Sequence, residues 1–170
     1  MDARVRSFAT LGVLALVLAL AAAWGWSALS EPFPDRSGPP VCVQRDVARG
    51  DTVKRRDVTV SVYNAGERVG LAGLTMDLLV AAGFAEGREA NAPVRRRVKR
   101  VQIWSVEPRN PAVRLVSSQF GRNVNVVRRT SDVPGVLVVV GDAFDDLVKG
   151  KRAVKADRAA TVCGPPRRAR

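Results

Sequence analysis

A run of cations in the middle of the chain is the strongest chemical signal in the sequence. Five basic residues fall within six positions: Arg95, Arg96, Arg97, Lys99 and Arg100. Because these charges lie within about one Debye length of each other, they predict a binding site for phosphate or carboxylate groups. The alternative is a solvated loop and strand edge, where cations prevent edge-to-edge pairing. Nucleic acid is not an expected partner, because Trp104 is the one aromatic residue close to the run.

A second candidate site is the turn that contains Asn64 and Gly66. Both residue types tolerate the backbone of a tight turn, and a helix is expected to follow this turn. Its backbone N–H groups could therefore meet an anion at the start of that helix. Turn geometry alone also explains the two residues, and the loop lacks the Gly-Lys-Ser/Thr ending of a phosphate-binding P-loop.

The sequence lacks the residues that most often carry out catalysis. The 170-residue chain contains no histidine, which removes the usual general base, the usual zinc ligand and any Ser-His-Asp triad. Asp142, Asp145 and Asp146 form the one acidic cluster considered for a metal, but a place at the start of a helix explains them as capping and dipole pairing. The sequence therefore predicts no catalytic residue, no metal site and no cofactor.

The segment 58–84 predicts a strand, a turn and a helix. Val58, Val60 and Val62 alternate with polar or aromatic residues, which indicates a strand with one apolar face. Leu71, Leu74 and Leu78 have helical spacing and predict an apolar stripe that faces a core. Gly83 is a suitable C-terminal stop for this helix, and a short strand is expected near 84–88.

A second unit repeats this plan from residue 101 onward. A strand is expected at 101–106, followed by a helix capped by Asn110 with Pro111 in its first turn. The predicted buried stripe of this helix consists of Val113, Val116 and Phe120, and Gly121 is expected to end the helix. The next strand is expected at 123–128. The apolar run 136–140 predicts a central strand covered on both faces, and Asp142 is expected to cap a final helix at 143–149. The prediction is a small α/β sandwich of two strand-turn-helix-strand units plus a final strand and helix, preceded by one transmembrane helix.

The N-terminal part predicts a membrane anchor. No charged residue lies between Ser7 and Ser30, and such a run is long enough to cross a hydrocarbon core of about 30 Å. Arg4 and Arg6 place residues 1–7 in the cytoplasm, residues 8–29 form the anchor, and the rest lies outside the membrane. The alternative is a cleavable signal peptide, since small residues at 21–23 offer a cleavage site.

Two cysteines bracket the expected extracytoplasmic domain. A Pro/Gly-rich spacer at 30–41 precedes Cys42, and a basic tail at 164–170 follows Cys163. Export favours one disulfide between them, which would close the domain at 42–163. The alternatives are two free thiols or a lipidated Cys42.

Several of these motifs are characteristic of one family. Val62-Tyr63-Asn64-Ala65-Gly66, then Gly70-Leu71-Ala72, then Gly83-Phe84, resemble the LytR C-terminal domain family, and Val138-Val139-Val140-Gly141-Asp142-Ala143-Phe144 resembles its last strand. The resemblance covers about 57–149. Two features depart from the family: the LytR-CpsA-Psr catalytic domain that often precedes this domain is missing, and the Arg-rich insertion before Val101 is unusual. One anchor, one such domain and two flanking cysteines are similar to the small envelope-integrity proteins of mycobacteria and related actinobacteria.

The resemblance and the net charge of +12 together predict a function. The expected protein is a non-catalytic, membrane-anchored module that supports cell-envelope integrity by binding a wall polymer or lipid. An apolar pocket between the helices and the sheet could receive lipid tails. The alternatives are an interaction platform within a membrane protein complex, with an envelope protein as partner, and a wall-polymer phosphotransferase or hydrolase.

Overall fold

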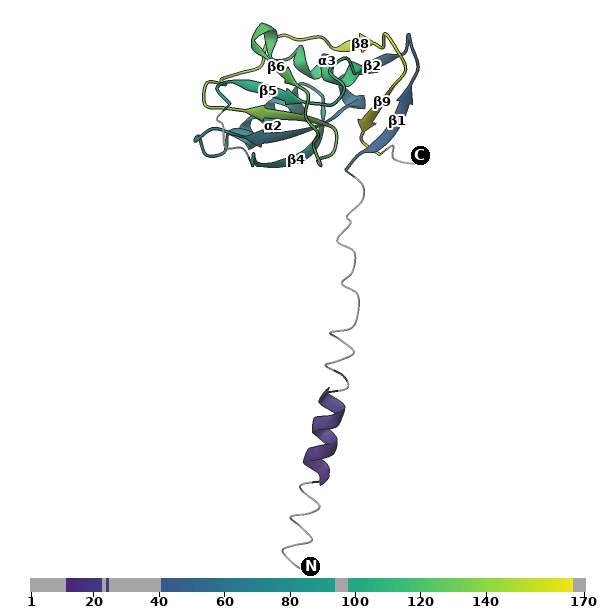
Figure 1. Cartoon of the computed structure of the whole chain (residues 1–170), viewed down its shortest axis with the longest axis vertical. Coiled ribbons are helices and arrows are strands. Elements are labelled where there is room, and N and C mark those ends of the chain that lie inside the picture. Colours follow the sequence, from purple (N-terminus) through teal and green to yellow (C-terminus); the bar gives the residue numbers. More distant parts are fainter. Residues whose placement is uncertain (1–11, 23, 25–40, 94–97, 167–170) are drawn as a thin grey trace, which may run out of the picture. The chain divides into compact units, whose positions relative to one another are not determined.

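The computed structural model describes residues 12–22, 24, 41–93 and 98–166, which fall into two compact units, Met1–Gly38 and Pro39–Arg170 (Figure 1). The described residues of the first unit, 12–22 and 24, are helical. Among all described residues, no helix combines the length and the hydropathy that a membrane span needs. Residues 8–11, 23 and 25–29 of the predicted anchor at 8–29 lie outside the described residues, as does all of the spacer at 30–41 except Val41, so the transmembrane helix stays a prediction.

The second unit is built on a five-stranded sheet with the strand order β4-β3-β7-β5-β6. Its strands are β3 (Thr59–Asn64), β4 (Ala85–Asn91), β5 (Val101–Trp104), β6 (Asn125–Val127) and β7 (Val136–Val140). β3 runs parallel to β4 and β7, β5 runs parallel to β6, and β5 and β7 are antiparallel. Both predicted strand-helix-strand units are therefore confirmed. All five residues of β7 are buried, which confirms the predicted central strand.

Both helices, α2 (Leu71–Ala81) and α3 (Pro111–Ser117), pack on one face of this sheet. The predicted stripe on α2 is wrong in part: Leu71 is buried, but Leu74 is 46% exposed and the core contacts come from Thr75, Met76 and Leu79. α2 is apolar on nearly every side, so the leucine spacing did not identify the buried face. The C-terminal stop is confirmed, because Gly83 has a φ of 99° and its N–H donates to the Val80 carbonyl.

The predicted start of α3 is confirmed in detail. The Asn110 side chain accepts a hydrogen bond from the Ala112 N–H at 3.0 Å, and Pro111 follows directly as the first helical residue. Val113, Val116 and Phe120 are all buried, as their spacing predicts. The helix ends at Ser117, and Gly121 begins a short 3-10 helix, η2 (Gly121–Asn123).

Two antiparallel ribbons, which no clear sequence period indicates, complete the unit. β1 (Val43–Val47) pairs with β9 (Ala160–Gly164), and β2 (Thr52–Lys54) pairs with β8 (Ala153–Lys155). A 3-10 helix, η1 (Arg55–Asp57), links β2 to β3. Val53, Val154 and Val162 of these ribbons join the main core, so the ribbons extend the layer that contains α2 and α3. The structure brings Cys42 and Cys163 to disulfide distance, with 5.5 Å between their Cα atoms.

The opposite face of the sheet carries a smaller core of Val98, Trp104, Leu137 and Val139, with no helix packed against it in the described part of the chain. The predicted final helix at 143–149 is wrong, because residues 145–150 have no regular secondary structure. Phe144 nevertheless packs into the main core against Phe120, with 5.6 Å between ring centroids. The apolar residues that suggested a helix therefore serve as a buried anchor for an irregular segment.

Candidate ligand-binding site

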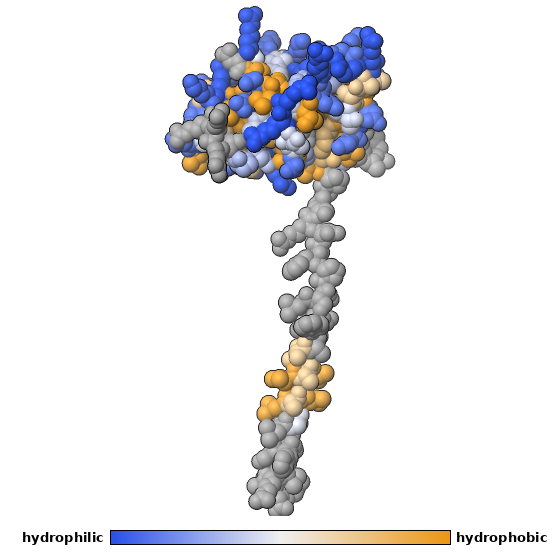
Figure 2. All heavy atoms as spheres, viewed as in Figure 1, coloured by the Kyte–Doolittle hydropathy of each residue, from blue (hydrophilic) through white to orange (hydrophobic). Residues whose placement is uncertain are grey.

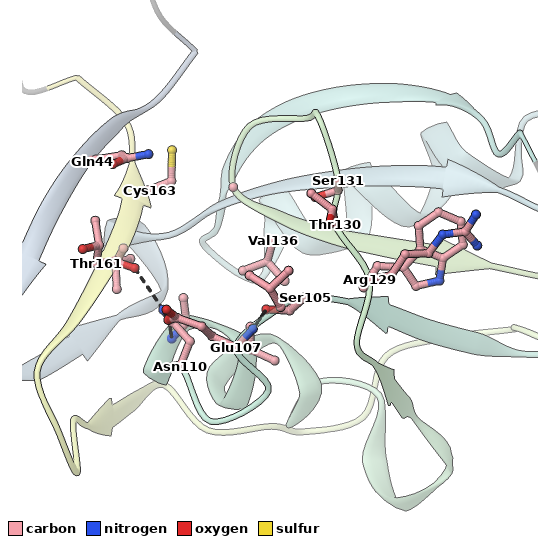
Figure 3. Close-up of a pocket in the computed structure, with 16 residues that line it drawn as sticks. Gln44, Ser105, Glu107, Asn110, Arg129, Thr130, Ser131, Val136, Thr161 and Cys163 are labelled. Carbon is pink, nitrogen blue, oxygen red and sulfur yellow. Dashed lines mark hydrogen bonds between the residues drawn. The ribbon is translucent and has the colours of Figure 1, made fainter.

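A hollow of about 310 Å³ opens between the β1–β9 ribbon, the start of α3 and the connection from β6 to β7 (Figure 3). Gln44, Thr161 and Cys163 lie on one side of it, and Thr130 and Ser131 lie on the other. Apolar side chains complete the lining: Val106, Ala112, Val113, Val136 and Val162. The size falls at the lower end of the range for small-ligand pockets, about 300–1,000 Å³.

The sheet topology explains why the hollow lies at this place. β5 and β6 are parallel, so their carboxyl ends meet at one edge, where Trp104 pairs with Val127. β7 begins at the same edge because it runs antiparallel to β5. The connection 128–135 must therefore cross the end of β5, and a crevice outside the carboxyl ends of parallel strands is a common ligand site.

Hydrogen bonds fix the walls of the hollow. The Asn110 side chain donates to the Thr161 carbonyl at 2.9 Å, which ties the β1–β9 ribbon to the start of α3. The Glu107 N–H donates to the Ser105 hydroxyl at 3.1 Å, and the Thr161 hydroxyl donates to Asp46 at 3.1 Å. The space between these elements is therefore held open by bonded groups.

Other polar groups of the hollow are left for a ligand. In the described part of the chain, the structure shows no hydrogen bond to the side chains of Gln44, Thr130 and Ser131. The Arg129 guanidinium lies over the ring of Trp104, with its central carbon 4.1 Å from the ring centroid. Stacking holds a guanidinium flat while its N–H groups stay available at the edge, an arrangement that suits carboxylate or phosphate oxygens.

The chemistry that this arrangement supports is binding. Glu107 is the one carboxylate that lines the hollow, and no cysteine in the described part of the chain is free. The described residues also contain no group of three or more His, Cys, Asp or Glu side chains that could hold a metal ion.

The predicted basic run does not line the hollow where the structure describes it. Arg95, Arg96 and Arg97 lie outside the described residues. The Lys99 carbonyl accepts from the Ala143 N–H at 2.9 Å, and the Arg100 carbonyl accepts from the Gly141 N–H at 2.8 Å. These bonds fix the backbone at the end of the run, while the Lys99 side chain is exposed and that of Arg100 is half-buried.

The turn at Asn64 and Gly66 is organised by an internal carboxylate. The Asn64 side chain accepts from the Gly66 N–H at 2.9 Å, and its amide donates to the Arg68 carbonyl at 2.7 Å. Oδ1 of Asp142 accepts from the N–H groups of Glu67 and Arg68 at 2.7 and 2.9 Å. The prediction that Asp142 caps a final helix is therefore wrong. Its carboxylate is instead the anion that this turn binds. A Cβ at Gly66 would lie 2.2 Å from Asp142 Oδ1, so the close approach requires glycine.

Sequence reasoning missed most residues of the hollow, because its walls come from segments far apart in the chain. One signal was present: Ser105 lies near the end of the strand predicted at 101–106, and residues 129–131 directly follow the strand predicted at 123–128. Placing both strands parallel in one sheet would have brought these residues to a common edge. No local pattern indicates the contribution of β1 and β9.

Comparison with known proteins places most of these elements in a family. A family model described as LytR cell envelope-related transcriptional attenuator matches residues 57–144, just over half of the chain. Among solved structures, the soluble domain of a conserved hypothetical secreted protein from Mycobacterium marinum is similar, with 22% sequence identity and a TM-score of 0.45 over 62% of this chain and 70% of that chain. No curated protein matches the sequence. The matched region includes Ser105, Arg129 and Val136, but not the wall formed by β1 and β9.

Proposed function

The chain belongs to the LytR C-terminal family, which is related to the cell envelope, and from this premise we propose that it is a binding module without catalytic activity. Its ligand is an anionic or amphipathic component of the envelope, either a wall polymer or a lipid. The module lies outside the membrane, is anchored by residues 8–29, and supports the integrity of the envelope by holding this component.

The hollow at the carboxyl ends of β5 and β6 is the observation that carries the proposal. It combines an apolar floor, which includes Val113 and Val136, with polar groups at Thr130 and Ser131 and a cation at Arg129. An amphipathic molecule with an anionic group satisfies both parts, because its apolar portion covers the floor while its oxygens meet the polar groups. This hollow takes the place of the apolar pocket expected between helices and sheet, where the structure has a filled core.

The surplus of positive charge supports an anionic ligand. The chain carries 28 Lys and Arg residues against 16 Asp and Glu residues. A positive field attracts anionic partners before contact is made, so it raises their local concentration near Arg129. The absence of histidine from the sequence supports binding over acid-base catalysis.

The test is to purify the full chain from its native membrane in a mild detergent and to identify bound lipids and glycans by mass spectrometry. Thr130→Trp fills the hollow at an exposed position and should remove the bound component. Ala159→Trp adds the same ring at an exposed position outside the hollow and should retain it. If both variants retain the same molecules as wild type, the hollow is not the site. If wild-type protein enriches nothing over a mock purification, the proposed function is wrong.

A second candidate function, an interaction platform in a membrane protein complex, is favoured by the outer face of α2. Leu74 and Val80 are 46% and 42% exposed, and Val69 just before the helix is fully exposed. Apolar side chains left exposed on a helix are one feature of protein contact surfaces. Replacing Leu74 and Val80 by Ser should abolish crosslinks to a protein partner in the native membrane while leaving lipid or glycan binding unchanged.

A further inference from the structure

A second polar surface lies on the β2–β8 ribbon and the neighbouring side of α3. We define this basic surface by five residues: Lys54, Arg114, Lys151, Arg152 and Lys155. β2 pairs with β8, and the Arg114 guanidinium lies 3.5 Å from the Lys155 carbonyl, so three separate segments contribute to it. Figure 2 shows hydrophilic residues gathered along the edge of the domain where Figure 1 shows β8 and β2.

The register of the β2–β8 ribbon places its two lysines, Lys54 and Lys155, on the side that faces solvent. Val53 and Val154 form the buried pair of the ribbon, so the flanking residues Lys54 and Lys155 face the opposite way, toward solvent. Lys54 lies opposite Ala153 and Lys155 lies opposite Thr52, which makes the two lysines diagonal neighbours. Such neighbours are about 7–8 Å apart, and no anion separates them along the ribbon. The two lysines are therefore held near one another, and no ion pair in the described part of the chain joins either of them to an acidic side chain.

The backbone that carries Lys151 and Arg152 is fixed while their side chains remain exposed. The Lys151 N–H donates to the Ser118 hydroxyl at 3.0 Å, and its carbonyl accepts from the Arg55 and Gln119 side chains at 2.9 and 3.0 Å. Gly150 packs so closely that a Cβ there would lie 2.5 Å from the Ser118 carbonyl. An ordered backbone lowers the entropy lost when the side chains bind a partner.

The acidic side chains beside this surface already bind other groups of the protein. Asp57 accepts from the Lys54 N–H at 3.0 Å, and Asp157 lies within 4 Å of the guanidinium groups of Arg114 and Arg158. The side chains of Lys54, Lys151, Arg152 and Lys155 have no such ion pair in the described part of the chain. The surface therefore keeps an unneutralised positive charge.

We propose that the basic surface binds a linear polyanion, a polymer with regularly repeated phosphate or carboxylate groups. Several cations on one surface suit such a chain, because successive anionic groups can each meet one cation and release bound counterions. A bilayer surface is the less suitable partner, since proteins that lie on membranes add Trp, Phe or Leu side chains that enter the acyl region. The segments 52–57 and 149–158, which supply four of the five cations, contain none of these residues.

This inference rests on the proposed function, because it names a polymer class for an envelope-binding module, yet it uses a separate surface. None of the five cations lines the hollow. The basic surface and the hollow can therefore be changed independently. The sequence signals are the basic runs Lys54-Arg55-Arg56 and 149–155, which the pairing of β2 with β8 joins into one surface.

The experiment uses the full chain in phosphatidylcholine nanodiscs and fluorescent poly(glycerol phosphate) as the probe, with binding measured by anisotropy over a series of salt concentrations. The surface variant is Lys151→Gln, Arg152→Gln and Lys155→Gln together. The control variant, Arg88→Gln, Arg109→Gln and Arg128→Gln, loses the same charge at exposed positions elsewhere. The surface variant should bind on the order of 10- to 100-fold more weakly at low salt, since three exposed contacts are lost. Its slope of log affinity against log salt should fall by about 2.

Four results would overturn the inference. Equal weakening in both variants would mean that net charge alone attracts the polymer. Full binding by the surface variant would exclude these cations. Binding to phosphatidylglycerol vesicles through the same three cations, without binding to the polymer, would make the surface a membrane contact. Thr130→Trp should bind the polymer as wild type does. If wild type binds no polymer but still retains its ligand in the hollow, this inference is wrong while the proposed function stands.

Discussion

Removing the link between Cys42 and Cys163 is expected to destabilise the domain by about 4–5 kcal/mol. The two residues are 121 positions apart in the sequence, so the bond closes a long loop in the unfolded chain. The chain-entropy model assigns about 4.7 kcal/mol to a loop of about 100 residues, and the value rises slowly with length. In the folded state, Cys163 pairs with Gln44 in the β1–β9 ribbon, whose backbone bonds persist without the link. The loss of stability therefore arises mainly because the unfolded chain gains conformational entropy when the link is removed.

This loss is large beside the usual total stability of a domain, about 5–15 kcal/mol. Cys42→Ser, Cys163→Ser and the double variant should each lower the melting temperature by on the order of 10–20 °C. The three decreases should be equal within error, because each variant removes the same link. The assay is thermal unfolding followed by far-UV circular dichroism, with each protein measured with and without a reductant. The reductant should bring wild type to the level of the variants and leave the variants unchanged.

The reasoning is refuted if the double variant is clearly less stable than either single variant, since the cysteines would then act separately. It is also refuted if both thiols of unreduced, denatured wild type react fully with an alkylating reagent. A melting temperature of the single variants equal to that of wild type would show that the link contributes no stability.

Three further predictions concern the anchor, the ligand site and the turn. Protease added to cells with opened walls should remove the domain and spare an N-terminal tag, whereas a protected C-terminal tag would refute the predicted topology. Arg129→Gln should weaken binding of the native anionic ligand by roughly 10-fold and change the melting temperature little, since the residue is exposed; unchanged affinity would exclude a contact. Asp142→Ala should lower the free energy of unfolding by about 1–3 kcal/mol in urea titrations, because the N–H groups of Glu67 and Arg68 lose their acceptor; an unchanged midpoint would count against this role.

The elements with a strong local signal could be predicted from the sequence. The alternation at Val58, Val60 and Val62 identifies the face of β3 that packs into the main core, although Thr59 and Ser61 on the other face are buried as well. Asn110 and Pro111 define the start of α3 because capping depends on residues within one turn. β7 was recognisable as a central strand because residues on both of its faces are buried.

Elements whose structure depends on distant contacts could not be predicted in the same way. Gly141-Asp142 has the local pattern of a helix start, but the Asp142 carboxylate instead meets the turn after β3. The strands β8 and β9 are short. Each is stabilised by pairing with a strand from the start of the domain sequence, β8 with β2 and β9 with β1. The hollow combines Gln44, residues 105–113, residues 129–136 and residues 161–163, so only the folded topology reveals it.

The most direct test of the central claim is photo-crosslinking from inside the hollow in growing cells. A photoreactive residue at Ser131, which lines the hollow, should form an adduct with an envelope lipid or polymer that mass spectrometry of the full chain can identify. The same residue at Ala159, outside the hollow, should not form it. The account is contradicted if Ser131 yields no such adduct, or if both positions yield the same one.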